Sequence, residues 1–170
     1  TNITKVGSGT WTLSGEGQHS GSTIVSQGAL FVNGSFVMSP IRLAASAVSI
    51  ASGAVLGGSG SIAGVTTIES GATLMPGAAI GIVGTFTVGG GLVLNGTTTI
   101  KLDLNESPTG ANDKVSVSAA NLTLSGGTVN FVINLLNGEL GAGTYSLIDG
   151  GATMVANPAP TMNLVGFPGG

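Results

Sequence analysis

The side chains best able to do chemistry gather in one stretch, DLNESPTGANDK, at residues 103–114. Two converging carboxylates can act as general acid and general base on a glycosidic bond, and the candidate pairs are Asp103 with Glu106 or with Asp113. The stretch is polar and rich in turn-forming residues, so we expect a loop in which these carboxylates are solvated. On this interpretation the chain is not an enzyme.

The same stretch begins like a calcium-binding loop. Asp103, Asn105 and Ser107 offer oxygen ligands at alternate positions, as the opening of such a loop does. Pro108 stands at the sixth position, where these loops have glycine, and the terminal glutamate is missing. We therefore expect no cofactor and no metal, with a structural calcium ion at these three residues as the alternative.

The other polar residues do not assemble a catalytic motif. His19 is the single histidine and lies in the loop GEGQHSG, where neighbouring serines and Glu16 are too local to hold the geometry of a triad. The basic residues are scattered, which argues against a polysaccharide lyase and leaves no basic patch for nucleic acid. These basic residues are Lys5, Arg42, Lys101 and Lys114.

Two aromatic residues are the candidates for ligand binding, Trp11 and Tyr145. A sugar-stacking surface normally presents two or three aromatic rings on one exposed face, and only 4% of this chain is aromatic. Trp11 alternates with Leu13 in TWTL, so both side chains should point inward or onto a terminal coil. Full burial of Trp11 would contribute about 3 kcal/mol to stability.

The elements that must position these residues are short strands. Apolar residues make up 42% of the chain, charged residues only 6%, and 31 of the 170 residues are glycine. Apolar and polar residues alternate in short runs that are cut by Gly, Asn or Ser, which predicts half-buried strands and almost no helix. Examples are TIVSQGALFVNG at 23–34, GTFTVGGGLVLNG at 84–96 and NLTLSGGTVNFVINLLNG at 121–138.

A repeated corner phrase indicates how the strands are arranged. A glycine followed by alanine and then a strand recurs at Gly28, Gly53 and Gly71, separated by 25 and 18 residues. Such a repeat predicts a β-solenoid of roughly seven coils, about 35 Å long, in which each corner glycine turns the chain. The alternative is an antiparallel β-sandwich, because Asn-Gly pairs such as Asn33-Gly34 and Asn95-Gly96 are typical of hairpins.

We expect one domain. Residues 1–127 would form solenoid coils, and residues 128–170 would form terminal coils with a Pro/Gly-rich segment that covers one end. Unpaired backbone at an exposed coil end would allow end-to-end self-association. No apolar run approaches the roughly 18 residues of a membrane span, and the absence of cysteine leaves the compartment open.

The segment near the N-terminus resembles a known family. KVGSGTWTLSGEGQHSGSTIVSQGALFVNG, residues 5–34, is similar to the passenger-associated transport repeat of bacterial autotransporters, and Lys5, Trp11 and Gly28 are among the matching residues. The following segment at 56–104 and the phrases NDKVSVSAANLTLSGGTVNF and GTYSLIDGG resemble the usual continuation. The resemblance implies a right-handed parallel β-helix and no chemistry.

This resemblance leads to a hypothesis about function. It implies a non-enzymatic structural or display segment of a large secreted or cell-surface bacterial protein, of which this chain would be one piece. The partners would be neighbouring segments of the same polypeptide. The alternative is a carbohydrate-binding or adhesive accessory module of an exported multidomain protein, with polysaccharide as the partner.

Overall fold

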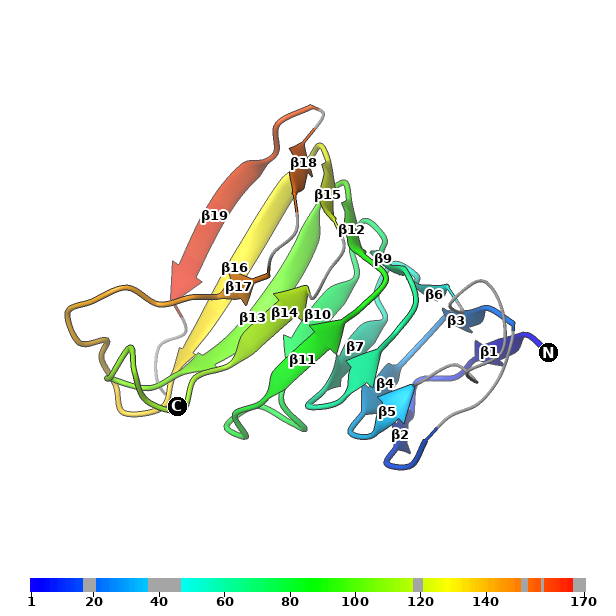
Figure 1. Ribbon diagram of the computed structural model, residues 1–170, viewed down its shortest axis with the longest axis horizontal. Coiled ribbons are helices and arrows are strands. Elements are labelled where there is room, and N and C mark those ends of the chain that lie inside the picture. The colour runs from blue at the N-terminus through cyan, green and yellow to red at the C-terminus, as the bar shows by residue number, and fades with distance from the viewer. Residues whose placement is uncertain (17–20, 37–46, 118–120, 151–152, 157, 167–170) are drawn as a thin grey trace.

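The computed structural model describes residues 1–16, 21–36, 47–117, 121–150, 153–156 and 158–166. Within these residues every regular element is a β-strand. The strands build three sheets that run along a rod, with the first strands at one end and the last at the other (Figure 1). The strands of these sheets pair in parallel, for example Ile3–Lys5 with Thr23–Val25. The chain is therefore a parallel β-helix, and the alternative of an antiparallel sandwich is wrong.

Each sheet takes its strands from successive coils, so the order of strands along the rod follows the chain. Sheet A consists of β1 (Ile3–Lys5), β3 (Thr23–Val25), β6 (Val48–Ile50), β9 (Thr66–Ile68), β12 (Leu92–Asn95), β15 (Leu122–Ser125) and β18 (Met154–Ala156). Sheet B consists of β2 (Thr10–Leu13), β4 (Ala29–Val32), β7 (Val55–Gly58), β10 (Thr73–Pro76), β13 (Thr98–Leu104), β16 (Thr128–Leu135) and β19 (Thr161–Gly166). Sheet C consists of β5 (Ser35–Phe36), β8 (Ser61–Ile62), β11 (Thr85–Val88), β14 (Lys114–Val117) and β17 (Ile148–Asp149).

Each coil contributes one strand to sheet A and one to sheet B, and within the described ranges these sheets hold seven strands each, as the repeat predicted. In sheet A, Thr23 pairs with Val48 and Val48 with Thr66, so the coils have the same spacings as the corner phrase. The glycines of that phrase, Gly28 and Gly53 among them, lie between a sheet A strand and a sheet B strand. Their φ angles of 70° and 79° belong to the left-handed region, which glycine adopts without strain.

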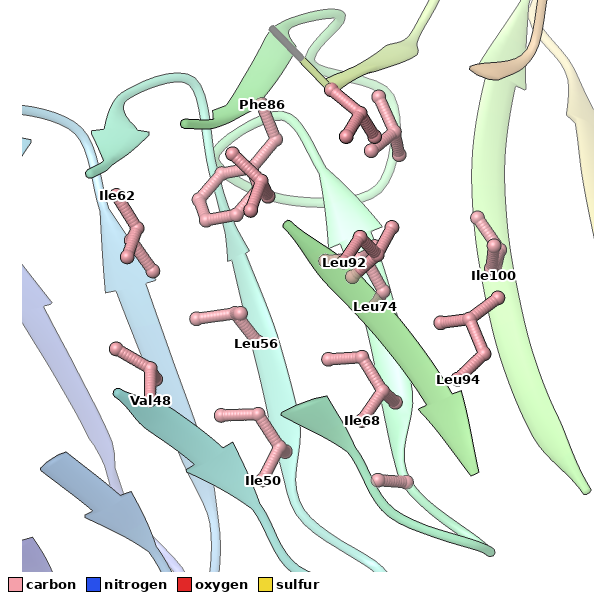
Figure 2. Packing of buried hydrophobic residues seen from close by; sticks show 14 of the residues in the cluster. Val48, Ile50, Leu56, Ile62, Ile68, Leu74, Phe86, Leu92, Leu94 and Ile100 are labelled. Atoms are coloured by element: carbon pink, nitrogen blue, oxygen red, sulfur yellow. The ribbon is translucent and has the colours of Figure 1, made fainter. Parts of the chain in front are cut away.

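The core is built from columns of inward-facing aliphatic residues. In sheet B the parallel register stacks Leu56 on Leu74 and Leu74 on Ile100, and all three are fully buried. Figure 2 shows these side chains in the interior together with Ile50 and Ile68, which form the corresponding column of sheet A. Each coil therefore buries its apolar face against the coils before and after it.

Sheet B widens abruptly along the rod, and this widening positions the candidate site. The strands β2, β4, β7 and β10 have four residues each, whereas β13 has seven and β16 has eight. Every residue of β13 pairs with a residue of β16, but β10 pairs only with Thr99 and Ile100 of β13. Among the described residues, no strand pairs with the remainder of β13, Lys101–Leu104, on its β10 side. We refer to this side as the free edge of β13.

The Pro/Gly-rich stretch near the C-terminus continues the rod. Thr161–Gly166 form β19, which pairs in parallel with β16 from Thr128 to Ile133. Its alternating residues form the outermost described strand of sheet B. The expectation that the stretch covers one end of the solenoid stays a prediction, and residues 157 and 167–170 of it lie outside the described residues. Strands from both parts of the chain, 1–127 and 128–170, belong to the same three sheets. The portion that the structure describes holds no helix with the length and apolarity needed to cross a membrane.

Candidate functional site

The free edge of β13 is closed by an aspartate instead of a strand. The backbone N–H of Asp103 donates to Oδ2 of Asp113 at 2.8 Å, and the N–H of Asp113 donates to the carbonyl of Asp103 at 2.8 Å. One residue thus satisfies both main-chain groups that a neighbouring strand would bind. At the next such position Asn112 satisfies the N–H group, since its Oδ1 accepts from the N–H of Asn105 at 2.7 Å.

The two aspartates also hold the loop at residues 77–84, which we call the covering loop. Oδ2 of Asp103 accepts from the N–H of Gly81 at 2.5 Å, and Oδ1 of Asp113 accepts from the N–H of Gly84 at 2.7 Å. The second oxygen of Asp103 accepts from Nδ2 of Asn134 on β16 at 2.6 Å. We call Asp103 and Asp113 the carboxylate clamp, because together they tie the covering loop to the free edge of β13.

Both members of the clamp are buried, with 3% of Asp103 and 1% of Asp113 exposed. The expectation that these carboxylates are solvated is therefore wrong for both, and of the three acids only Glu106 is exposed. The physical reason is the widening of sheet B. Asp103 belongs to the extension of β13 and points outward by alternation, but the covering loop from the preceding coil lies over it.

The clamp is electrostatically unusual. Burial is the main cause that raises the pKa of Asp113 to about 7, and the negative charge of Asp103 adds to the effect, whereas hydrogen bonds from the N–H groups of Asp103 and Gly84 oppose it. Among the described residues, the ion pair that forms nearby joins Lys114 to Asp149 and includes neither clamp carboxylate. Two acids therefore share a buried site without a paired cation.

The space beside the clamp is too small for a substrate. The cavity lined by Asp103, Asp113, Asn134 and Ile80 has a volume of about 10 Å³, which is about the room needed for one water molecule. All four carboxylate oxygens accept a hydrogen bond from a protein N–H group. The arrangement of these acids matches a structural fastening and lacks the open cleft that a glycosidic bond would need.

The residues of the suggested calcium loop also bind protein groups. Oδ1 of Asn105 accepts from the N–H of Glu106 at 2.9 Å, and it accepts from Nδ2 of Asn137 as well. Oγ of Ser107 lies 3.1 Å from Oγ1 of Thr109. Across the ranges that the structure describes, no three His, Cys, Asp or Glu side chains are grouped so that they could hold a metal ion.

Asn112 organises the inside of this loop and was missed by sequence reasoning. Its Nδ2 donates to the carbonyl of Ser107 at 2.9 Å and lies 3.2 Å from that of Gly110. An Asn-Asp pair directly before a strand is the only sequence signal that points to this role. The partner from β16, Asn134, gives no local signal, because its contact with Asp103 joins two different coils.

Tyr145 fastens the loop after β16 to the loop after β13. Its hydroxyl donates to the carbonyl of Glu106 at 2.6 Å and lies 3.1 Å from that of Asn105. The half-buried Tyr145 also lines a groove of about 420 Å³ together with Pro108, Lys114 and Ser146. This groove lies on the sheet C side of the rod and is large enough for a sugar ring.

Trp11 lies at the opposite end of the rod. Its strand β2 is the outermost strand of sheet B, and Trp11 pairs with Leu30, an inward residue that is 1% exposed. The register therefore directs Trp11 inward, as expected, but 38% of the residue is exposed because no further described strand covers β2. Trp11 is therefore an inward-facing residue of a terminal coil, without the full burial that would contribute about 3 kcal/mol. About five coil spacings, or roughly 24 Å, separate Trp11 from Tyr145, so the two rings cannot stack on one sugar.

A second fastening joins the first two coils. Lys5 is only 7% exposed, and its Nζ donates to the carbonyl of Gly7 at 2.8 Å and to that of Gln27 at 2.9 Å. Gly28 packs directly on this contact, because a Cβ built there would lie 2.4 Å from the carbonyl of Gly9 and 2.7 Å from Nζ of Lys5. A buried ammonium group and a corner glycine thus hold the turn from sheet A to sheet B.

Two of the residues considered in the sequence, His19 and Arg42, lie outside the described residues. The interpretation of His19 as a surface residue therefore stays a prediction.

Comparison with known proteins identifies the segment that holds this second fastening. Residues 3–31 match the family model of the passenger-associated-transport-repeat. The comparisons with curated proteins and with solved structures give no match. The matched segment spans β1 to β4 and includes both Lys5 and Gly28. The match therefore confirms that the first coils of this parallel β-helix resemble a passenger-associated-transport-repeat.

Proposed function

We propose that the chain is a structural and display segment of an exported bacterial protein. The observation that carries this proposal is continuity: the strand register that begins in the segment matching the passenger-associated-transport-repeat runs unbroken through sheet B from β2 to β19. A rod of this kind extends and presents whatever adjoins it. The matched family is described as a passenger-associated-transport-repeat, that is, a repeat found in the exported part of a transported protein. We therefore propose a secreted or cell-surface location. The proposed partners are neighbouring segments of the same polypeptide.

The mechanical basis of this function is the fastening of each coil to the preceding one. Main-chain hydrogen bonds join the strands, and side-chain amides add further links on the outside of the rod. Nδ2 of Asn95 donates to Glu69 at 3.0 Å, and Nδ2 of Asn163 donates to Asn130 at 3.0 Å. These links cross from one coil to the coil before it, so they resist both unwinding and bending.

Deletion of one whole coil tests the proposal. Removal of residues 48–65 would join Ala47 to Thr66, and the register predicts that β9 then pairs with β3, because Val48 pairs with both Thr23 and Thr66. The control removes residues 92–109, a segment of equal length that takes away β12 and β13 but leaves β14. Both variants are exported behind a signal peptide with an epitope tag at the far end.

We expect the whole-coil deletion to keep the tag outside the cell on a rod that resists protease, and the control to lose both properties. A structural segment needs only correct stacking, so it should tolerate a shorter rod. Equal loss in both variants would overturn the proposal, because it would mean that the removed coil has a specific role of its own.

A second function that we propose is carbohydrate binding in the groove beside Tyr145. A tyrosine, a proline, a lysine and a serine are among the residues that line this groove, a combination suited to a sugar with both apolar and hydroxyl-bearing faces. Affinity electrophoresis in gels containing plant or bacterial polysaccharides tests it. We expect retardation that Tyr145→Ala weakens and Trp11→Ala leaves unchanged. Migration that no polysaccharide retards would remove this candidate.

A further inference from the structure

The covering loop lies over the edge of β13 that Asp113 closes in place of a strand. The extension of β13 has a described strand on its β16 side only, and an open strand edge presents unpaired N–H and C=O groups that can capture other chains. The covering loop is itself exposed, with 59% of Ile80 and 54% of Ile82 accessible to solvent. Two carboxylate contacts, to the N–H groups of Gly81 and Gly84, hold it in place.

The charges around the clamp do not balance. Residues 77–84 contain no titratable side chain, and β16 contributes the neutral Asn134. On β13, Lys101 lines the same small cavity, but within the described part of the chain it forms no ion pair with either clamp carboxylate. On β14, Lys114 is paired with Asp149 of β17. When both clamp residues are ionised, two negative charges are thus buried together without a partner cation.

We propose that the carboxylate clamp is a proton-controlled latch, which holds the covering loop over the free edge of β13 most firmly while Asp113 is protonated. Ionisation of Asp113 places a second negative charge beside Asp103 in one buried site, and opening of the loop hydrates it. The loop then moves away from Asp103 and Asp113, and the edge of β13 is uncovered. The order of this segment of the rod therefore depends on pH.

The direction of the pH effect follows from linkage. The pKa of Asp113 is about 7 with the latch closed, and it returns toward its ordinary value of 3.8 when the loop opens to water. The closed form therefore binds more protons than the open form between these two values, so closure weakens as the pH rises from about 4 to about 7. Between pH 5 and pH 7.5, the opening constant should rise at least about tenfold.

Amide hydrogen exchange measures this opening directly. Protection factors of Gly81 and Gly84 are determined from pH 5 to pH 8, with correction for the intrinsic pH dependence of exchange. In the unmodified chain we expect both protection factors to fall at least about tenfold between pH 5 and pH 7.5. The ¹³Cγ shift of Asp113, followed in the same samples, should change over the same pH range.

Two matched variants distinguish the latch from a general effect of pH. Asp113→Asn removes the titrating group at nearly constant shape, but it leaves one acceptor oxygen for the N–H groups of Asp103 and Gly84 where the carboxylate has two. The readout is therefore Gly81, which is bonded to Asp103 and whose protection should become independent of pH. Asp149→Asn makes the same chemical change outside the clamp and should leave the tenfold fall intact. Protection factors in the unmodified chain that do not change between pH 5 and pH 7.5 would overturn the proposal, and so would a fall that persists in Asp113→Asn. If that variant does not fold, a ¹³Cγ shift of Asp113 that does not change across this range would be equally decisive.

Discussion

The substitution Gly28→Ala tests the packing of the corner most sharply, because the next coil supplies a matched control. Gly28 and Gly53 occupy equivalent corners and have nearly the same φ, 70° and 79°. A Cβ at Gly53 would meet nothing within 4 Å, whereas one at Gly28 would lie 2.4 Å from the carbonyl of Gly9 and 2.7 Å from Nζ of Lys5. The two substitutions share backbone strain and differ only in the collision.

The expected magnitudes follow from this difference. An alanine with positive φ costs about 1–2 kcal/mol, and we expect this loss of unfolding free energy for Gly53→Ala. At Gly28 the backbone must also move, which breaks hydrogen bonds from the Lys5 ammonium group that are worth about 1.5–3 kcal/mol each. We therefore expect Gly28→Ala to lower the free energy of unfolding by roughly 3–5 kcal/mol.

Urea unfolding, followed by circular dichroism and by fluorescence of Trp11, measures both variants. The single Trp11 lies on β2 and reports the first coil, whereas circular dichroism reports the whole rod. Repeat structures can lose terminal coils separately, so the fluorescence transition of Gly28→Ala should move to lower urea than its dichroism transition. If the unfolding free energies of the two variants differ by less than about 1 kcal/mol, the reasoning is refuted, because the collision at Gly28 would then have no measurable effect on stability.

Other substitutions and conditions test the remaining parts of the structure. Lys5→Met should lower the unfolding free energy, measured by urea unfolding, by about 1–3 kcal/mol, since the carbonyls of Gly7 and Gln27 lose their donor. A loss of less than about 0.5 kcal/mol would contradict the role given to these hydrogen bonds. Phe86→Ala, at a fully buried residue of β11, should cost about 3–5 kcal/mol in the same assay, and a loss under about 1 kcal/mol would contradict the packing of the core. The ionisation of Asp113 should lower the unfolding free energy by roughly 2–4 kcal/mol between pH 4.5 and pH 7.5, because a group with a raised pKa stabilises the folded chain only while it is protonated. The difference in unfolding free energy between the unmodified chain and Asp113→Asn, measured at each pH, isolates this effect. A difference that does not change with pH would refute it.

Much of the fold could be predicted from the sequence because the corner geometry repeats. Gly28 and Gly53 are each followed by alanine and a strand, since each of these coils makes the same turn between sheets A and B. Alternation also predicted the direction of Trp11, as its pairing with Leu30 shows. Alternation does not say what covers a residue, however, and for this reason the sequence left open whether Trp11 lies in the core or on a terminal coil.

The burial of the carboxylate clamp could not be predicted, because it depends on strand lengths in different coils. Asp103 and Asp113 lie in a polar stretch that is locally typical of a solvated loop. They are buried because β13 extends past the end of β10 and the covering loop fills the gap. In the same way, the composition of the Pro/Gly-rich stretch does not show that TMNLVG pairs with β16 as a strand of sheet B, because this pairing joins two coils.

Cysteine cross-linking tests the central claim, a continuous parallel rod with this register, most directly. The chain contains no cysteine, so introduced pairs can be detected without background. Val55 pairs with Thr73 and Thr73 with Thr99, all three half-buried beside inward leucine or isoleucine residues. Adjacent parallel strands lie about 4.8 Å apart, within the span of a disulfide, whereas strands two coils apart are about 9.6 Å apart. After oxidation, mass spectrometry should find disulfides in the double variants Val55→Cys/Thr73→Cys and Thr73→Cys/Thr99→Cys and none in Val55→Cys/Thr99→Cys. Cross-linking in the last variant, or its absence from both of the first two, would contradict the account.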